Sequence, residues 1–328
     1  MAMNTILADK TIDNSRSGAI TGTLTTDTTG TIYSVADDWG TSYVYAGAPT
    51  DNWVKFAGYY WRIIRINGDG SIRMIYAGKS TTESGTDDQI QTTQFNYEAA
   101  DNAFVGYMYG SKESSTYAET HANNHSSRTK GTLDTWYQNN IINKESGSGT
   151  SYDSYVSKEA GFCNDREAQS GVESGFGTTG YGSNLTTYAP LGRLRSNGNW
   201  KSSQTPSLKC SQIENDMFTA SGSSKGNHKL TYPVGLITSD EVVLAGGFGG
   251  SSNISYYLYT GEYYWTMSPY FFSTGGGSNV FVVPSNGGFN RSGVTSVYGI
   301  RPVINLDVNV TLSGSGTSTD PYVVEGAM

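Results

Sequence analysis

The chain is poor in charge, histidine and cysteine: only 15% of its 328 residues are Asp, Glu, Lys or Arg, and it has three His and two Cys. Acidic residues outnumber basic ones by 29 to 21, which gives a net charge of −8. Because so few cations could not neutralise a run of phosphates, we expect no nucleic-acid partner. No apolar run approaches the roughly 18 residues of a membrane-spanning helix, so we expect no membrane span.

Motifs of the common catalytic and metal sites are also lacking. There is no GxSxG, no P-loop and no HExxH, and GGFGG at 246–250 follows a predicted helix instead of opening one. His121 and His125 lie in THANNHSSRTK, which is typical of a solvated loop. We therefore expect no enzyme, no catalytic residue, no metal site and no cofactor. Calcium stays an open alternative for a loop-rich fold, although no motif demands it.

Aromatic residues and glycine are abundant instead. The chain holds 24 Tyr, 11 Phe, 6 Trp and 41 Gly, which is enough aromatic material for a core despite the low charge. A composition rich in Gly, Ser, Thr, Asn and Tyr and poor in Lys is typical of secreted or surface β-rich proteins, so we expect an extracellular or cell-surface location. The start, MAMNTILADK, does not have the pattern of a signal peptide, and we expect it to begin downstream of one.

The two cysteines, Cys163 and Cys210, are 47 positions apart in loop-like sequence. A redox pair or a metal site would be the functional alternatives, but none of the three histidines stands at ligand spacing from either cysteine. We favour a structural disulfide, as in an exported protein.

The order of patterns predicts an α+β fold in one main domain. Two apolar runs, 54–66 and 71–78, flank the turn at 67–70 and predict a hairpin. Helices are predicted over 131–142, capped by Thr132, and over 236–247, capped by Ser239. A long irregular region at 144–228 lies between them, and aromatic strand-like runs follow.

We divide the chain into three parts. Residues 1–39 are a Thr/Ser-rich N-terminal extension or a few strands, and residues 40–312 are the main domain. Residues 313–328 are a closing strand or a tail.

The stretch 270–298 stands apart, because it contains no Asp, Glu, Lys, His or Cys. Its mixture of Phe, Tyr, Ser, Asn and Gly lacks general acids and bases but suits recognition, as in antibody binding loops. The alternative is an ordinary hairpin whose Val280, Phe281 and Val282 are structural.

The end of the chain resembles a known fold. YYWTMSP (263–269) and YGIRPVIN (298–305) resemble the final strands of the C-type lectin-like fold, which formylglycine-generating enzymes share with retroelement-diversified receptor proteins. Four further motifs, at 52–76, 161–167, 230–242 and 315–324, resemble exported gut-bacterial surface proteins that carry such a domain. The resemblance covers most of residues 30–324. It implies antiparallel sheets with two short helices and long irregular loops.

The resemblance also implies roles for individual residues. Cys163 and Cys210 would be a structural pair, and Arg301 would be a buried and paired scaffold residue. No Cys follows position 210, so the catalytic cysteines of the formylglycine-generating enzymes have no counterpart, and the EPN or QPD motif of calcium-dependent lectins is absent. The ligand face of diversified receptors maps onto Tyr270, Phe271, Phe272, Ser273, Asn279, Phe281, Ser285, Asn286, Phe289, Asn290, Arg291, Ser292, Thr295 and Tyr298.

We therefore expect a secreted or surface-displayed receptor-like or adhesin-like protein that presents a hypervariable binding face on 270–298. Its ligand would be a protein or a glycan on another cell or surface. Its other partners would be a surface-anchoring protein or further copies of the same chain. Two alternatives stay open, a structural subunit of a surface appendage such as a pilus and a glycan-active enzyme. The enzyme would need carboxylates assembled from distant loops.

Overall fold

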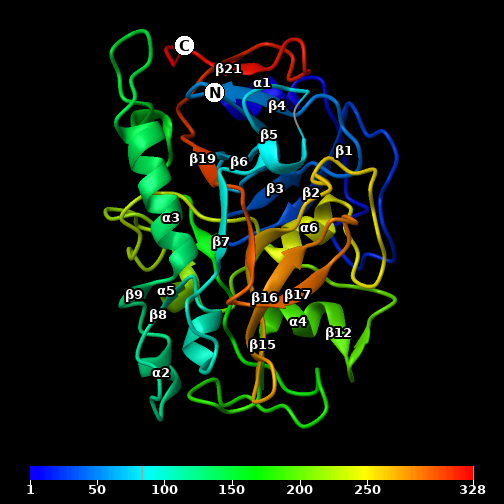
Figure 1. Cartoon of the computed structure of the whole chain (residues 1–328). Helices are drawn as coiled ribbons and strands as arrows, with labels where there is room; N and C mark the ends of the chain where they lie inside the picture. The colour runs from blue at the N-terminus through cyan, green and yellow to red at the C-terminus, as the bar shows by residue number, and fades with distance from the viewer. Residues whose placement is uncertain (83, 328) are drawn as a thin grey trace.

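The structure is a computed structural model that describes residues 1–82 and 84–327. Strands predominate in it, with short helices, so the α+β class is confirmed (Figure 1). Two large sheets hold most of the strands, and segments near both ends of the chain lie at the top of the view in Figure 1.

The first sheet has nine strands within the described residues and combines both ends of the chain. Its longest strand, β5, pairs with β4 along its first half, with β3 along its last residues and with β6 at its other edge. Near the C-terminus, β21 pairs with β4 in parallel, and β19 pairs with β6. Its members are β1 (Thr11–Asp13), β2 (Thr31–Ala36), β3 (Thr41–Val44), β4 (Trp53–Phe56), β5 (Tyr59–Ile66), β6 (Ile72–Tyr76), β19 (Val303–Leu306), β20 (Leu312–Ser313) and β21 (Tyr322–Val324).

The hairpin predicted from the two apolar runs is present, with one difference. The first run is two strands, because Ala57 and Gly58 have φ values of 55° and 80° and turn the chain between β4 and β5. Two successive positive φ angles suit the tight turns that join antiparallel strands. The predicted turn at 67–70 joins β5 to β6.

The second sheet has six strands within the described residues and is built around β15 and β16. These two long strands pair with each other, and β17 forms one edge of the sheet while β7 forms the other. The members are β7 (Gln91–Gln94), β11 (Thr186–Thr187), β15 (Tyr264–Ser273), β16 (Gly277–Val283), β17 (Asn290–Gly293) and β18 (Val297–Ile300). Three small pairs complete the strands: β8 (Met108–Tyr109) with β9 (His125–Ser126), β10 (Phe162–Cys163) with β14 (Met217–Phe218), and β12 (Arg195–Ser196) with β13 (Asn199–Trp200).

Both predicted helices are present, and both begin at a different cap. Helix α3 begins at Arg128, because the side chain of Ser127 caps it, and Thr132 lies inside the helix. Helix α6 is capped by Thr238, which forms a capping box with Glu241, and it ends at Gly246 with φ 125°. The α-helices are α1 (Ala2–Leu7), α2 (Tyr117–Thr120), α3 (Arg128–Tyr137), α4 (Ala189–Leu194), α5 (Ile213–Asp216) and α6 (Ser239–Ala245).

Residues 144–228 are more ordered than predicted. They hold the short helices α4 and α5, the strands β10 to β14 and a 3-10 turn at Tyr152–Tyr155. Two further 3-10 turns lie earlier in the chain, at Gly85–Asp88 and Asn102–Val105.

Candidate functional site

The aromatic part of the predicted binding face belongs to the core. A ligand face would need these rings at the surface, whereas the structure buries them, as in the alternative of an ordinary structural hairpin. The cause is the position of β15 and β16 inside the second sheet, where α4 and the turn Asn102–Val105 pack against β15. The buried members of the face, each 8% exposed or less, are Tyr270, Phe271, Phe272, Asn279, Phe281 and Phe289.

Arg291, the one cation of the face, covers part of this core. Its guanidinium lies 4.6 Å from the ring centre of Phe271 and donates a hydrogen bond of 3.2 Å to Oδ1 of Asn279. The side chain is exposed, but it packs along aromatic rings instead of extending into solvent. The guanidinium of Arg291 therefore has two partners within the protein, the ring of Phe271 and the side chain of Asn279.

The rest of the predicted face is polar and accessible. Ser273, Ser292 and Tyr298 are half-buried, and Tyr298 stacks on Tyr263 with 4.9 Å between ring centres. Ligand binding by the accessible residues stays a prediction. The exposed ones are Ser285, Asn286, Asn290, Arg291 and Thr295.

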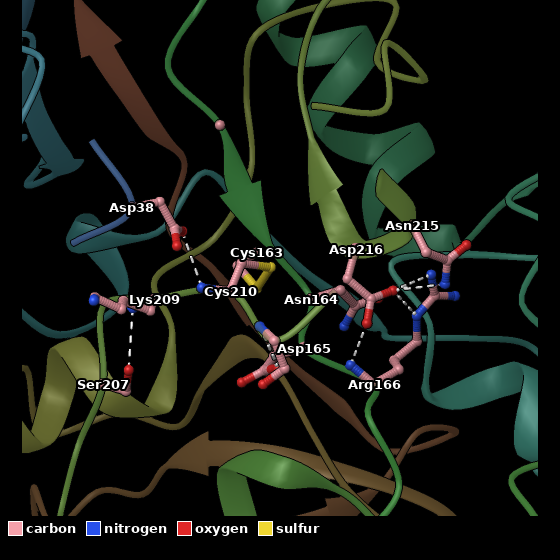
Figure 2. Close-up of a disulfide and its surroundings, with 12 residues drawn as sticks. Asp38, Cys163, Asn164, Asp165, Arg166, Ser207, Lys209, Cys210, Asn215 and Asp216 are labelled. Atoms are coloured by element: carbon pink, nitrogen blue, oxygen red, sulfur yellow. Dashed lines mark hydrogen bonds and ion pairs between the residues drawn. A yellow bond between two sulfur atoms is a disulfide. The ribbon is translucent and has the colours of Figure 1, made fainter. Parts of the chain in front are cut away.

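The predicted disulfide between Cys163 and Cys210 is confirmed, and Figure 2 shows its surroundings. It fastens the loop after β13 to strand β10. The backbone N–H of Cys210 donates to the carboxylate of Asp38 over 2.9 Å, which attaches the same loop to the turn after β2. The bond thus staples a long segment to the core, as we expected of a structural pair.

Beside the disulfide, Arg166 and Asp216 form an ion pair that is completely buried. Their side chains are 2.6 Å apart, and the backbone N–H of Arg166 also donates to Asp216. Burial raises the pKa of Asp216, and the charge of Arg166 opposes that rise without cancelling it. The polar partners of the two side chains all belong to the chain itself. We therefore assign this ion pair to the stability of the fold.

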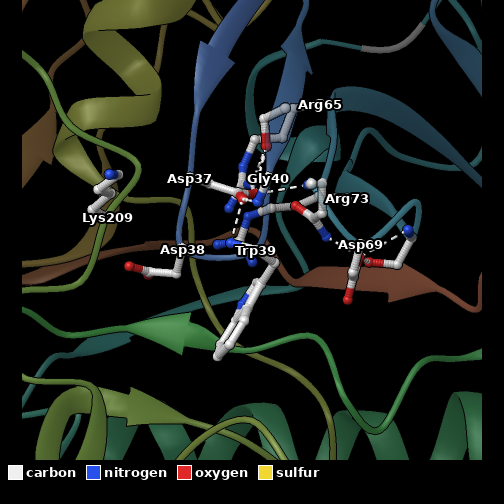
Figure 3. A network of polar contacts seen from close by, with 12 residues as sticks. Asp37, Asp38, Trp39, Gly40, Arg65, Asp69, Arg73 and Lys209 are labelled. Carbon is white, nitrogen blue, oxygen red and sulfur yellow. Dashed lines mark hydrogen bonds and ion pairs between the residues drawn. The ribbon is translucent and has the colours of Figure 1, made fainter.

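A second buried network connects strands β5 and β6 and the turn after β2 to α6, and Figure 3 shows its members Asp37, Arg65 and Arg73. Nε of Arg73 lies 2.5 Å from Oε1 of Glu241, and Nε of Arg65 lies 3.0 Å from the same oxygen. Arg65 also contacts Asp37 at 3.1 Å. Burial alone would raise the pKa of Glu241, but Arg73, Arg65 and the backbone N–H of Thr238 outweigh it and hold that pKa below its usual value.

This network leaves little room for a ligand. It lines two hollows of about 30 and 20 Å³, and a cavity needs roughly 10–15 Å³ for one water molecule. Its carboxylates are committed to arginines and backbone N–H groups. We assign it to stability.

The roomier hollows are lined in part by residues of α3. In Figure 1 this helix lies on the outer side of the molecule near β7. One has a volume of about 550 Å³ and the other about 310 Å³. Both fall in the range of small-molecule sites, roughly 300–1,000 Å³. Trp136 and Asn140 line both hollows. We call the two hollows together the α3 groove.

The amino-acid sequence of α3 explains the groove. Leu133, Tyr137 and Ile141, spaced as one helical face, are fully buried and hold the helix against the core. The opposite face carries the short residues Gly131 and Thr135 at the same spacing. A Cβ atom at Gly131 would meet no heavy atom within 4 Å, so this position opens directly onto free space.

Trp136 is the rigid wall of the groove. Its ring centre lies 5.7 Å from that of Tyr59, 6.1 Å from that of Trp61 and 5.9 Å from that of Tyr76. The side chain is half-buried in this cluster, so it offers the groove an aromatic surface in a fixed position. The first hollow has a second ring, that of Tyr97, which is 65% exposed and has the Arg128 guanidinium 4.7 Å from its centre.

Two amides of the groove come from an irregular turn. Helix α3 continues into a single π-helical turn, Gln138–Ile142, which carries Asn139 and Asn140. Both polar atoms of the Asn140 side-chain amide are hydrogen-bonded. The hydroxyl of Tyr59 donates to its Oδ1 over 2.6 Å, and its Nδ2 donates to the carbonyl of Trp136 over 2.9 Å. Turns of the π-helical type are rare in proteins, and those that are found often lie at functional sites.

Charge is sparse in the groove. Arg128 lines the first hollow, and Lys79 and Asp87 line the second. Among the described lining residues Asp87 is the one carboxylate, whereas glycoside hydrolysis by the common route needs two. The groove can accept hydrogen bonds, donate them and pack apolar surface. These capacities suit binding.

Three further findings bear on the chain as a whole. Arg301 is buried and donates to the carbonyls of Tyr76 and Leu258, as the resemblance implied. His121 is buried, with Nε2 2.8 Å from the carbonyl oxygen of Gly180, so the solvated loop expected there is wrong for this residue. In residues 1–82 and 84–327 there is no helix long and apolar enough to cross a membrane and no cluster of three or more His, Cys, Asp or Glu side chains suited to a metal ion.

Comparison with known protein families, with curated proteins and with solved structures finds no match to this chain.

The groove was missed at the level of sequence because its parts come from distant segments. Tyr59, Gln91 and Asn139 belong to β5, β7 and the π-helical turn. One indication was present: WYQNN at 136–140 places three amides beside an aromatic pair at the end of a predicted helix.

Proposed function

We propose that this chain is a binding protein of the receptor or adhesin kind, displayed on a cell surface or secreted, and that it holds its ligand in the α3 groove. The observation that carries the proposal is the groove itself, an open hollow in which the aromatic wall of Trp136 and the amide of Asn140 are fixed by their neighbours. Preorganised contacts favour binding because little side-chain freedom is lost when the ligand arrives.

Two other features support the location and the fold. The disulfide fits an oxidising compartment, where such bonds persist. For the fold we propose a C-type lectin-like domain. The resemblance of 263–269 and 298–305 supports it, and these segments supply the neighbouring strands β15 and β18.

The experiment uses the open position at Gly131. The fluorescently labelled chain is titrated onto intact bacterial cells and onto wells coated with mucin. Gly131→Phe would place a ring in the first hollow, whereas Gly131→Ala adds only one methyl group, and both residues suit a helix better than glycine.

The proposal predicts saturable binding by the chain and by Gly131→Ala, and loss of that binding in Gly131→Phe. Equal binding by all three would place the ligand elsewhere. Absence of saturable binding to either surface would contradict the proposed function.

A further inference from the structure

We infer that the occupant of the α3 groove is a carbohydrate chain with little or no charge. This inference rests on the proposed function and names the class of ligand. It starts from the kinds of side chain that meet in the first hollow: two aromatic rings, amides and hydroxyls, with Arg128 as its charged lining residue.

The aromatic surfaces fit the apolar faces of sugar rings. A pyranose presents C–H groups on its faces and hydroxyls around its rim, so it packs flat on an aromatic side chain while its rim stays polar. Trp136 is held for such a contact by Tyr59, Trp61 and Tyr76. Because these rings already hold the Trp136 side chain in place, little of its conformational entropy is lost on binding.

The amides fit the hydroxyl rim. Each Asn or Gln side chain offers two N–H donors and an accepting oxygen, which is the combination that adjacent sugar hydroxyls require. Asn139 and Gln91 line the first hollow and are exposed, and within the described residues no hydrogen bond occupies either side chain. Asn140 adds a group whose orientation is already fixed by Tyr59.

The charge of the groove fits a neutral ligand better than an anionic one. Arg128 already donates to Oε1 of Gln94 over 2.5 Å and packs on Tyr97. In the second hollow Lys79 and Asp87 carry opposite charges. Phosphate or sulfate groups are bound by clusters of cations, and this lining offers no such cluster among its described residues.

The shape of the groove favours a chain over a single sugar. Two hollows share the lining residues Trp136 and Asn140, and each alone reaches the size of a small-molecule site. An oligosaccharide that contacts the shared indole therefore has space for further sugar units on either hollow's side.

The test is a printed array of defined neutral and acidic oligosaccharides, from disaccharides to hexasaccharides, followed by calorimetric titration of the strongest neutral binder. The inference predicts signals from neutral oligosaccharides, which Gly131→Phe abolishes and Gly131→Ala retains. Asn139→Ala should weaken binding about tenfold, because one polar contact is lost. Asn199→Ala removes an exposed amide of β13 that lines neither hollow, and it should leave affinity unchanged.

The outcomes separate this inference from the proposed function. If no oligosaccharide binds, but groove-dependent capture by cells or mucin persists after periodate has oxidised their glycans, the ligand is not a carbohydrate and the binding function stands. Signals from acidic oligosaccharides alone would overturn the neutral class. If neither surface captures the chain, the proposed function fails first.

Discussion

The hydroxyl of Tyr59 donates to Oδ1 of Asn140 over 2.6 Å and so ties strand β5 to the π-helical turn after α3. The same turn is tied to α3 by the bond from Asn140 Nδ2 to the Trp136 carbonyl. The aromatic wall and one amide of the groove are therefore positioned by a single connected set of contacts.

Tyr59→Phe tests this connection with little change of shape. The variant keeps the ring against Trp136 but removes the donor, so the amide of Asn140 keeps only its bond to the Trp136 carbonyl and is held less firmly. We expect the free energy of unfolding to fall by about 1 kcal/mol and ligand affinity to fall several-fold. Urea denaturation and calorimetric titration measure the two effects. Unchanged affinity would show that Asn140 does not contribute to the site.

Phe281→Ala tests the burial of the predicted binding face. The ring is fully buried and packs against Tyr270 and Phe289, so its removal leaves a cavity. We expect a loss of about 3–5 kcal/mol in the free energy of unfolding. Asn290→Ala, in the same segment but exposed, should change it by less than about 0.5 kcal/mol. Equal stability of the two variants would contradict the burial.

Glu241→Gln tests the charge network beside α6. It leaves the guanidinium of Arg73 buried without its counterion, and we expect a loss of about 3–5 kcal/mol. Glu98→Gln breaks the exposed pair with Lys112 and should cost less than about 1 kcal/mol. Chemical denaturation at neutral pH compares them, and similar losses would be evidence against the network's role.

The same network gives stability a dependence on pH. The pKa of Glu241 is lower in the folded chain than its usual 4.5. Its carboxylate is therefore protonated more readily in the unfolded chain than in the folded chain. The stabilisation is complete above pH 4.5 and is lost as the pH falls through the lower folded value. The difference in unfolding free energy between the chain and Glu241→Gln should therefore narrow in acid. If this difference in unfolding free energy instead became larger as the pH fell, the lowered pKa of Glu241 in the folded chain would be contradicted.

Replacing both Cys163 and Cys210 by Ala tests the staple. The disulfide closes a loop with a sequence separation of 47, so the unfolded chain gains freedom without it, and we expect a loss of about 4 kcal/mol. The midpoint of urea unfolding in the absence of reductant measures this loss. A midpoint equal to that of the parent chain would mean that Asp38 and the surrounding packing hold the loop unaided.

The sequence was informative where local chemistry decides the structure. The turn at 67–70 and the presence of α3 and α6 follow from spacing and turn residues. The helix caps were misplaced by one residue at α6 and by five at α3, because Thr238 and Ser127 compete with equally good candidates nearby.

Long-range contacts explain the remaining differences. The stretch 270–298 has the composition of a recognition loop, but α4 and the turn Asn102–Val105 cover its rings, and neither contact is visible from the segment itself. The groove likewise depends on the meeting of Tyr59, Trp136 and Gln91, which local patterns cannot predict.

The most direct test of the account is an amide nitrogen–proton spectrum of the chain titrated with its strongest oligosaccharide binder. The account predicts that the side-chain amides of Asn139, Asn140 and Gln91 and the indole N–H of Trp136 shift with a common dissociation constant. Asn286 and Asn290 should not move. Shifts confined to residues 285–295, with the groove unchanged, would contradict the account and return the site to the face predicted from the sequence.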